Sequence, residues 1–179
     1  SYPDMVVLAE GTPIILETSI DNDFKVTYEQ LKQAITDKTK WIVINSPSNP
    51  TGTCYSVEEL KEIGKILDEF PHVGFITDDI YEKIVYDNFK FSTLATVIPK
   101  HKDRILTVNG VSKAYSMTGW RIGYAGASKD IIKSMAKIQS QSTTNPSSIS
   151  QYAALGALEG EEEFIFKNNK IFKKRRDLI

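Results

Sequence analysis

The hydrophobic and polar positions of this 179-residue chain alternate between short apolar runs and longer amphipathic stretches. The short runs are rich in β-branched and aromatic residues, a composition typical of strands. The predicted strands are residues 6–8, 13–17, 41–45, 73–77, 104–109 and 120–125. Helices are predicted at residues 129–139 and 148–158 and from residue 161 onward, and two more begin after residues 27 and 56.

The two helices that begin after residues 27 and 56 carry clear start signals. Thr27 followed by Gln30, and Ser56 followed by Glu59, fit a capping box, in which side chains satisfy backbone amides at the start of a helix. The second helix then repeats apolar residues at a spacing that puts them on one face, which should pack on a sheet. These residues are Leu60, Ile63, Leu67 and Phe70.

The order of the elements predicts an α/β fold. Residues 41–77 form a strand, a helix and a strand, and such a crossover joins parallel strands. Only ten residues separate Asn109 from Trp120, too few for a helical crossover, so the last strand is predicted to be antiparallel. Its start, with Arg121, should then lie at the same sheet edge as the ends of the parallel strands, where ligands of such sheets bind.

Composition and charge exclude several classes of protein. Apolar residues make up 41% of the chain, charged residues 25%, and 22 basic residues balance 23 acidic ones, which disfavours a disordered chain or a nucleic-acid-binding protein. No apolar run approaches the roughly 18 residues of a membrane helix, so no membrane association is expected. Cys54 is the single cysteine and suits a reducing compartment, which predicts a cytoplasmic location. Neither histidine has metal-ligand spacing, so no metal site is expected.

The two ends of the chain are unusual. It opens at Ser1 without Met, and it stops at Ile179 within the charged helical pattern of residues 173–179. We therefore expect a piece of a longer protein.

Residues with chemical potential follow three successive strands. Asn49 lies in a stiff proline-containing loop, Asp78 and Tyr81 follow the strand at residues 73–77, and Lys113 follows the strand at residues 104–109, with Arg121 eight residues later. Each has an ordinary interpretation, namely a structural turn, a helix cap or a solvated surface charge. Together they supply what pyridoxal phosphate requires: an amine for a Schiff base, an acid for the ring nitrogen, donors for the ring oxygen and a cation for the phosphate.

Three motifs carry a resemblance to a known family. Residues 46–52 (SPSNPTG), 78–81 (DDIY) and 112–123 (SKAYSMTGWRIG) resemble the class I aminotransferases of the aspartate aminotransferase family. This family more often has Asp-Glu-x-Tyr at the second motif. The resemblance implies the fold-type-I pyridoxal-phosphate architecture, a three-layer αβα arrangement with a mostly parallel sheet and one antiparallel strand. Residues 1–3 and 140–146 look most like the bacterial branch, some of whose members also accept prephenate.

The resemblance also implies catalytic roles. Lys113 would hold the cofactor as a Schiff base and then move the proton between the substrate Cα and the cofactor C4′. Asp78 would pair with the pyridinium nitrogen and keep it protonated. Tyr81 would hydrogen-bond the ring 3′-oxygen, which favours its anion.

The remaining implied roles concern binding. Asn49 would contact the same ring oxygen and the substrate α-carboxylate, and Arg121 would bind the phosphate with Ser112 nearby. Gly110 stands where some relatives carry a phosphate-binding serine, so no hydroxyl role is transferred to that position. The animal-type arginine for the distal carboxylate is also missing, since Ser140 stands at about its position.

The predicted function is therefore a pyridoxal-5′-phosphate-dependent transaminase that most resembles L-aspartate:2-oxoglutarate aminotransferases, a homodimer at full length. Residues 1–158 would form the C-terminal part of the cofactor-binding large domain, and residues 159–179 the start of the long helix leading to a small domain. This segment alone is expected to be inactive.

Three alternatives stay open from the sequence. The amino donor could be aromatic, alanine or another amino acid. The chain could belong to the sensor domain of a transcription regulator, or it could be an inactive remnant.

Overall fold

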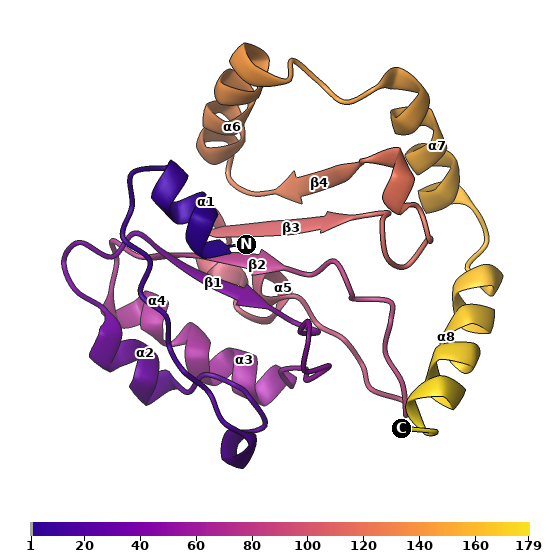
Figure 1. The fold of residues 1–179 in the computed structure, drawn as a ribbon. Helices are drawn as coiled ribbons and strands as arrows, with labels where there is room; N and C mark the ends of the chain where they lie inside the picture. Colours follow the sequence, from indigo (N-terminus) through magenta and orange to yellow (C-terminus); the bar gives the residue numbers. More distant parts are fainter. Residues whose placement is uncertain (1) are drawn as a thin grey trace.

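The computed structural model describes residues 2–179 and is built around a four-stranded sheet (Figure 1). The strands lie in the order β1 (Trp41–Asn45), β2 (Gly74–Asp78), β3 (Ile105–Gly110) and β4 (Gly123–Gly126). β1, β2 and β3 are parallel to one another, and β4 is antiparallel to β3. The mostly parallel sheet with one antiparallel strand confirms the fold class predicted from the sequence.

Helices connect and flank these strands. The α-helices are α1 (Tyr2–Leu8), α2 (Tyr28–Ala34), α3 (Val57–Gly64), α4 (Ile66–Glu69), α5 (Leu94–Val97), α6 (Lys129–Ser142), α7 (Ser148–Glu159) and α8 (Glu163–Arg176). Short 3₁₀ helices are η1 (Ile20–Asn22), η2 (Pro99–Arg104) and η3 (Thr118–Trp120). None of the helices formed by residues 2–179 combines the length and apolar character needed to cross a bilayer.

The main core lies between the sheet and helices α2 to α5. Ile66 of α4 and Phe75 of β2 are fully buried there, and Leu60 and Ile63 of α3 face the same core, as the spacing predicted. Burying each such side chain contributes about 1.5–3 kcal/mol. Helices α6 and α7 instead lie on the β4 side of the sheet, and α8 continues their arc past the strand ends, away from this layer (Figure 1).

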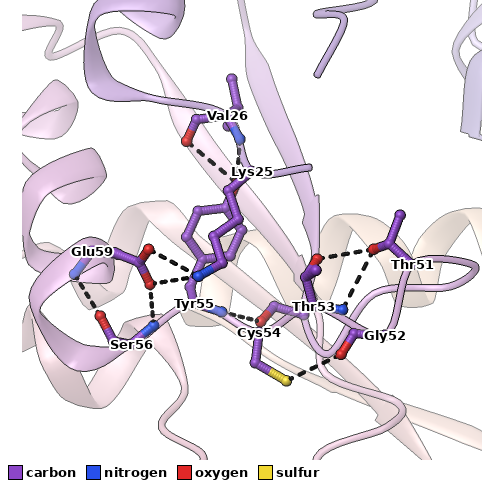
Figure 2. A network of polar contacts seen from close by, with 10 residues as sticks. Lys25, Val26, Thr51, Gly52, Thr53, Cys54, Tyr55, Ser56 and Glu59 are labelled. Carbon is purple, nitrogen blue, oxygen red and sulfur yellow. Dashed lines mark hydrogen bonds and ion pairs between the residues drawn. The ribbon is translucent and has the colours of Figure 1, made fainter. Parts of the chain in front are cut away.

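Both predicted capping boxes are present. The amide of Glu59 donates to Ser56 Oγ at 3.2 Å, and the amide of Ser56 donates to Glu59 Oε2 at 2.6 Å. Lys25 Nζ also pairs with Glu59 Oε1 at 2.9 Å, and the amide of Val26 donates to Tyr55 Oη at 2.7 Å. Figure 2 shows these contacts together. This network fixes the start of α3 directly after the loop that carries Asn49.

Two predicted strands are wrong. Residues 6–8 belong to helix α1, because a run of three apolar residues fits a helix as well as a strand. Residues 13–17 form neither helix nor strand, and Ile14 and Ile15 are exposed. Among the described residues no neighbouring strand pairs with this segment, so its strand propensity has no ladder to satisfy.

The last strand begins later than its apolar pattern suggested. Residues 118–120 form the η3 turn, and Arg121 adopts a left-handed backbone with φ of 55°. Pairing with β3 therefore starts only at Gly123, which lies opposite Gly110.

Candidate functional site

The parallel strands β1, β2 and β3 end at one edge of the sheet, and the loops that follow them carry the predicted site residues (Figure 1). Asp78 is the last residue of β2 and is half-buried. Its Oδ1 accepts a hydrogen bond from the amide of Ile80 at 3.2 Å, and its Oδ2 accepts one from the Tyr2 hydroxyl. Burial, and then the hydrogen bond to Asp78, raise the pKa of Tyr2, so this phenol remains a donor at neutral pH.

The Asn49 loop reaches the same edge from β1. Asn49 Nδ2 donates to Tyr81 Oη at 3.3 Å, which brings two predicted ligands of one ring oxygen together. Asn45 holds the loop in place, because its Oδ1 accepts from the amide of Asn49 at 3.0 Å and its Nδ2 donates to the carbonyl of Asp78 at 2.9 Å. The Ser46–Pro47 and Asn49–Pro50 peptide bonds are both cis.

Lys113 approaches these residues from the loop after β3. Its Nζ lies 5.7 Å from the centroid of the Tyr81 ring, within the range of a cation–π contact. The sequence suggested a partly desolvated lysine, but Lys113 is exposed within this chain. The loop itself is closed by hydrogen bonds from Ser116 N to Lys113 O and from Met117 N to Ser112 O, each 3.1 Å.

Ser112 and Arg121 flank the paired ends of β3 and β4. Gly110 and Gly123 are register partners, so Ser112 follows that pair by two residues and Arg121 precedes it by two. Arg121 Nη1 donates to the carbonyl of Thr118 at 2.9 Å, which uses one of the five guanidinium donors. Within residues 2–179, no hydrogen bond or ion pair joins the side chain of Ser112 or Arg121 to the side chains of Asn49, Asp78, Tyr81 or Lys113.

Gly110 has a packing reason to lack a side chain. A Cβ at this position would lie 2.9 Å from the carbonyl oxygen of Ile122 and 3.1 Å from the Ile80 side chain. A serine would therefore require the backbone at Ile122 and Gly123 to shift, which gives glycine a packing advantage at this position.

Asp79 is a buried acid that the sequence analysis did not single out. The residue is 4% exposed and lies beside a small cavity that is also lined by Ser46, Thr77 and Leu94. Burial raises the pKa of Asp79 to about 6. Thr93 lies next to it, yet Thr93 Oγ1 is buried without a hydrogen-bond partner of good geometry among residues 2–179.

A family model described as aminotransferase class I and II matches residues 1–179. The chain belongs to this family. Members of the family depend on pyridoxal 5′-phosphate, so the cofactor predicted from the sequence is confirmed at the level of the family. Its reactions use amino acids and 2-oxo acids as substrates.

Similar proteins place the chain more closely within the aminotransferase family. It is 59% identical over 178 residues to a probable aspartate/prephenate aminotransferase of Rickettsia felis, covering 99% of this chain and 44% of that protein. It superposes on the crystal structure of the aspartate aminotransferase from Rhizobium meliloti with a TM-score of 0.97 at 49% identity, over 99% of this chain and 44% of that one. An aromatic aminotransferase from Pyrococcus horikoshii gives a TM-score of 0.94 at 36% identity, over 99% and 48% of the two chains. The chain thus spans less than half the length of these relatives.

The side chains at the strand ends fit the family's cofactor. Among the described residues, each carboxylate oxygen of Asp78 accepts one hydrogen bond, and such an oxygen can accept more than one. Tyr81 and Asn49 offer a phenol and an amide at one point, and Lys113 offers an amine beside them. The bond from Arg121 to the Thr118 carbonyl uses only Nη1, so the other guanidinium nitrogens can donate to a ligand. The residues described contain no group of three His, Cys, Asp or Glu side chains placed to hold a metal ion.

Sequence reasoning missed three residues, of which Tyr2 and Asn45 organise this edge and Asp79 is buried beside it. Tyr2 gave no signal, since it contacts Asp78 across 76 positions of sequence. Asn45 and Asp79 could have been found, because Asn45 ends the mostly apolar strand β1 and Asp79 directly follows β2. A polar side chain in that position needs a hydrogen-bonding reason to be there.

Proposed function

We propose that the full-length protein is an aspartate aminotransferase that converts L-aspartate and 2-oxoglutarate into oxaloacetate and L-glutamate, and that it also accepts prephenate as an amino acceptor. The observation that carries this proposal is the meeting of Asn49, Asp78, Tyr81 and Lys113 at one sheet edge. The similarity to aspartate/prephenate aminotransferases supports the choice of substrates.

In this proposal each residue acts on a defined atom. Bound pyridoxal phosphate supplies an electron-accepting ring that stabilises the charge left when a proton leaves the substrate Cα. Asp78 holds a proton at the ring nitrogen, and Tyr81 and Asn49 donate to the ring oxygen. Lys113 would hold the cofactor through its amine, and once the substrate amine had replaced it there, the freed Lys113 amine would accept and return the proton at the substrate Cα.

Binding falls to the remaining residues. Arg121 binds the phosphate through its planar donors, with Ser112 beside it, because guanidinium matches phosphate geometry in two parallel hydrogen bonds. Asn49 also contacts the substrate α-carboxylate.

We further propose that residues 1–158 belong to the cofactor-binding large domain and that residues 159–179 begin the helix leading to a small domain. The break between α7 and α8 after Glu159 supports this boundary. The same proposal includes a homodimer in the cytoplasm.

The test uses the full-length protein, with Lys113→Ala compared with Lys129→Ala, an exposed lysine of α6. Lys113→Ala should lose the visible absorption band of covalently bound cofactor and about 10²–10⁴-fold or more of the transamination rate, the usual contribution of a proton-transferring group. Lys129→Ala should retain both. Normal turnover by Lys113→Ala would refute the proposed mechanism.

A panel of amino donors tests the substrate. Half-reactions with aspartate, phenylalanine and alanine should be fastest with aspartate. Equal or faster reaction with phenylalanine would replace the aspartate proposal with an aromatic aminotransferase, the activity named for the Pyrococcus horikoshii structure.

A further inference from the structure

Lys83 connects three segments around the site, although none of the proposed cofactor or substrate contacts involves it. It lies two residues after Tyr81, and its side chain is 29% exposed. Its Nζ donates to Tyr115 Oη at 3.1 Å and to Glu162 Oε1, and it lies 5.4 Å from the centroid of the Tyr115 ring. Its carbonyl accepts from Asn169 Nδ2 of α8 at 2.6 Å. One residue therefore links the segment after β2, the loop after β3 and α8.

Tyr115 connects Lys83 to the loop that carries Lys113. It follows Lys113 by two residues, within the loop closed by the Ser116 and Met117 amides. Its ring packs against the small core formed by Val111, Ile122 and Ala154. The ring is thus held by apolar contacts while the hydroxyl is held by Lys83, so the loop is restrained at both ends of one side chain.

The α8 side of the contact is charged. Partial burial acts to lower the pKa of Lys83, but hydrogen bonds to Glu162 and Tyr115 outweigh it and raise the pKa, so Lys83 stays cationic at neutral pH. Farther along α8, the side chains of Lys173 and Arg176 donate to the Asp87 carboxylate, at 2.5 Å and 2.8 Å. The segment after Tyr81 is therefore clamped to α8 at two separate points.

We propose that Lys83 is a positioning residue for Lys113, which holds Tyr115, and with it the Lys113 loop, in register with the segment that carries Tyr81. The inference rests on the proposed function. Its geometric basis is that two cross-links join the same two segments, one from Lys83 to Tyr115 and one from Lys113 to the Tyr81 ring. The first is a charge-assisted hydrogen bond to the hydroxyl of the half-buried Tyr115. It therefore restrains the second, which is a looser contact of an exposed lysine.

The experiment replaces Lys83 in the full-length, cofactor-loaded enzyme. Lys83→Met keeps the length of the side chain and removes its charge, and kcat should fall about tenfold with little change in KM, as expected for a misplaced catalytic group. The pH midpoint of the visible band of the bound cofactor should shift as well. Lys83→Arg, which can still donate to Tyr115, should restore most of the rate.

Tyr115→Phe provides an independent arm that keeps the ring in its core and removes only the acceptor. It should reproduce the kcat and spectral changes of Lys83→Met, and the double variant should be no worse than either single variant, because both changes break one contact. The matched control is Lys100→Met, which removes an exposed pair with Asp68 and should leave kcat and the spectrum unchanged.

Two results overturn the inference. If Lys83→Met and Tyr115→Phe lower the thermal stability but leave kcat and the absorption band unchanged, Lys83 is only a structural clamp. If the two single effects add in the double variant, the residues do not act through one contact. Loss of activity in Lys113→Ala together with normal behaviour of Lys83→Met would reject this inference alone, whereas normal activity of Lys113→Ala would reject the proposed function.

Discussion

Asp78 and Asp79 are adjacent in sequence and occupy opposite environments. Asp78 faces the strand-end edge, where Tyr2 and the amide of Ile80 donate to it. Asp79 points into the core beside a small cavity. Successive side chains at a strand end point to opposite faces, so one carboxylate is available to a ligand and the other is enclosed.

The burial of Asp79 predicts a pH-dependent stability. Folding raises the pKa of Asp79 from 3.8 to about 6, because burial favours the protonated acid. The free energy of unfolding is therefore highest below about pH 4, and it decreases as the pH rises through about 6. The loss is on the order of 3 kcal/mol, at 1.36 kcal/mol for each pKa unit. Asp79→Asn should remove this pH-dependent loss. The free energy of unfolding of the variant relative to wild type should therefore be higher at about pH 7 than at about pH 4.

Urea unfolding of the full-length wild type and of the Asp79→Asn variant, at about pH 4 and about pH 7, measures this difference in the free energy of unfolding. Asp103→Asn, an exposed acid of η2, controls for the loss of a carboxyl group. An Asp79→Asn difference that does not change with pH would contradict the prediction.

Among the elements, the clearest agreement between sequence and structure lies at helix starts. A capping box is a local motif, because all of its hydrogen bonds form within four residues, and both Thr27 and Ser56 begin helices as predicted. The strands are less local. Residues 41–45 have neighbours to pair with and form β1, whereas residues 13–17 have none among the described residues and remain irregular.

The cap at Ser56 predicts a specific loss of stability. Ser56→Ala should lower the free energy of unfolding by about 1 kcal/mol, because the Glu59 amide loses its acceptor. Ser128→Ala is the matched control, since Ser128 precedes α6 but makes no side-chain cap hydrogen bond. Chemical unfolding of both variants checks the prediction, and equal losses would show that the box contributes nothing beyond the substitution itself.

At the scale of the whole molecule, α7 leaves an apolar stripe uncovered within this chain. Ile149, Tyr152 and Leu155 lie three residues apart on one side of the helix and are 71%, 76% and 47% exposed. Apolar surface of this kind in a folded protein usually contacts another part of the protein or a partner. The proposed full-length homodimer provides both.

This stripe predicts the behaviour of the segment on its own. The isolated 179-residue chain should bind a hydrophobic dye more strongly than the full-length protein, and it should show no transamination. Ile149→Lys with Tyr152→Lys should reduce the dye fluorescence, while Ser148→Lys with Gln151→Lys, which adds the same charge to α7 at polar exposed positions, should not. Equal dye binding by the isolated chain and the full-length protein would contradict this interpretation.

The sequence by itself determined the α/β fold class, the antiparallel last strand, the helix caps and the family motifs. These features depend on residues close together along the chain, on periodicity, turn chemistry and capping, so local physics suffices. It also placed Asn49, Asp78, Tyr81 and Lys113 at strand ends, because parallel strands bring their carboxyl ends to one edge.

Only the tertiary structure decided which distant groups meet there. Two hydrogen bonds join residues far apart in sequence, namely Tyr2 to Asp78 and Lys83 to Tyr115. The burial of Asp79 and the close approach of Gly110 to Ile122 depend on how the segments pack. No local pattern encodes such contacts, because they arise from how the sheet, the loops and α8 pack together and exclude water.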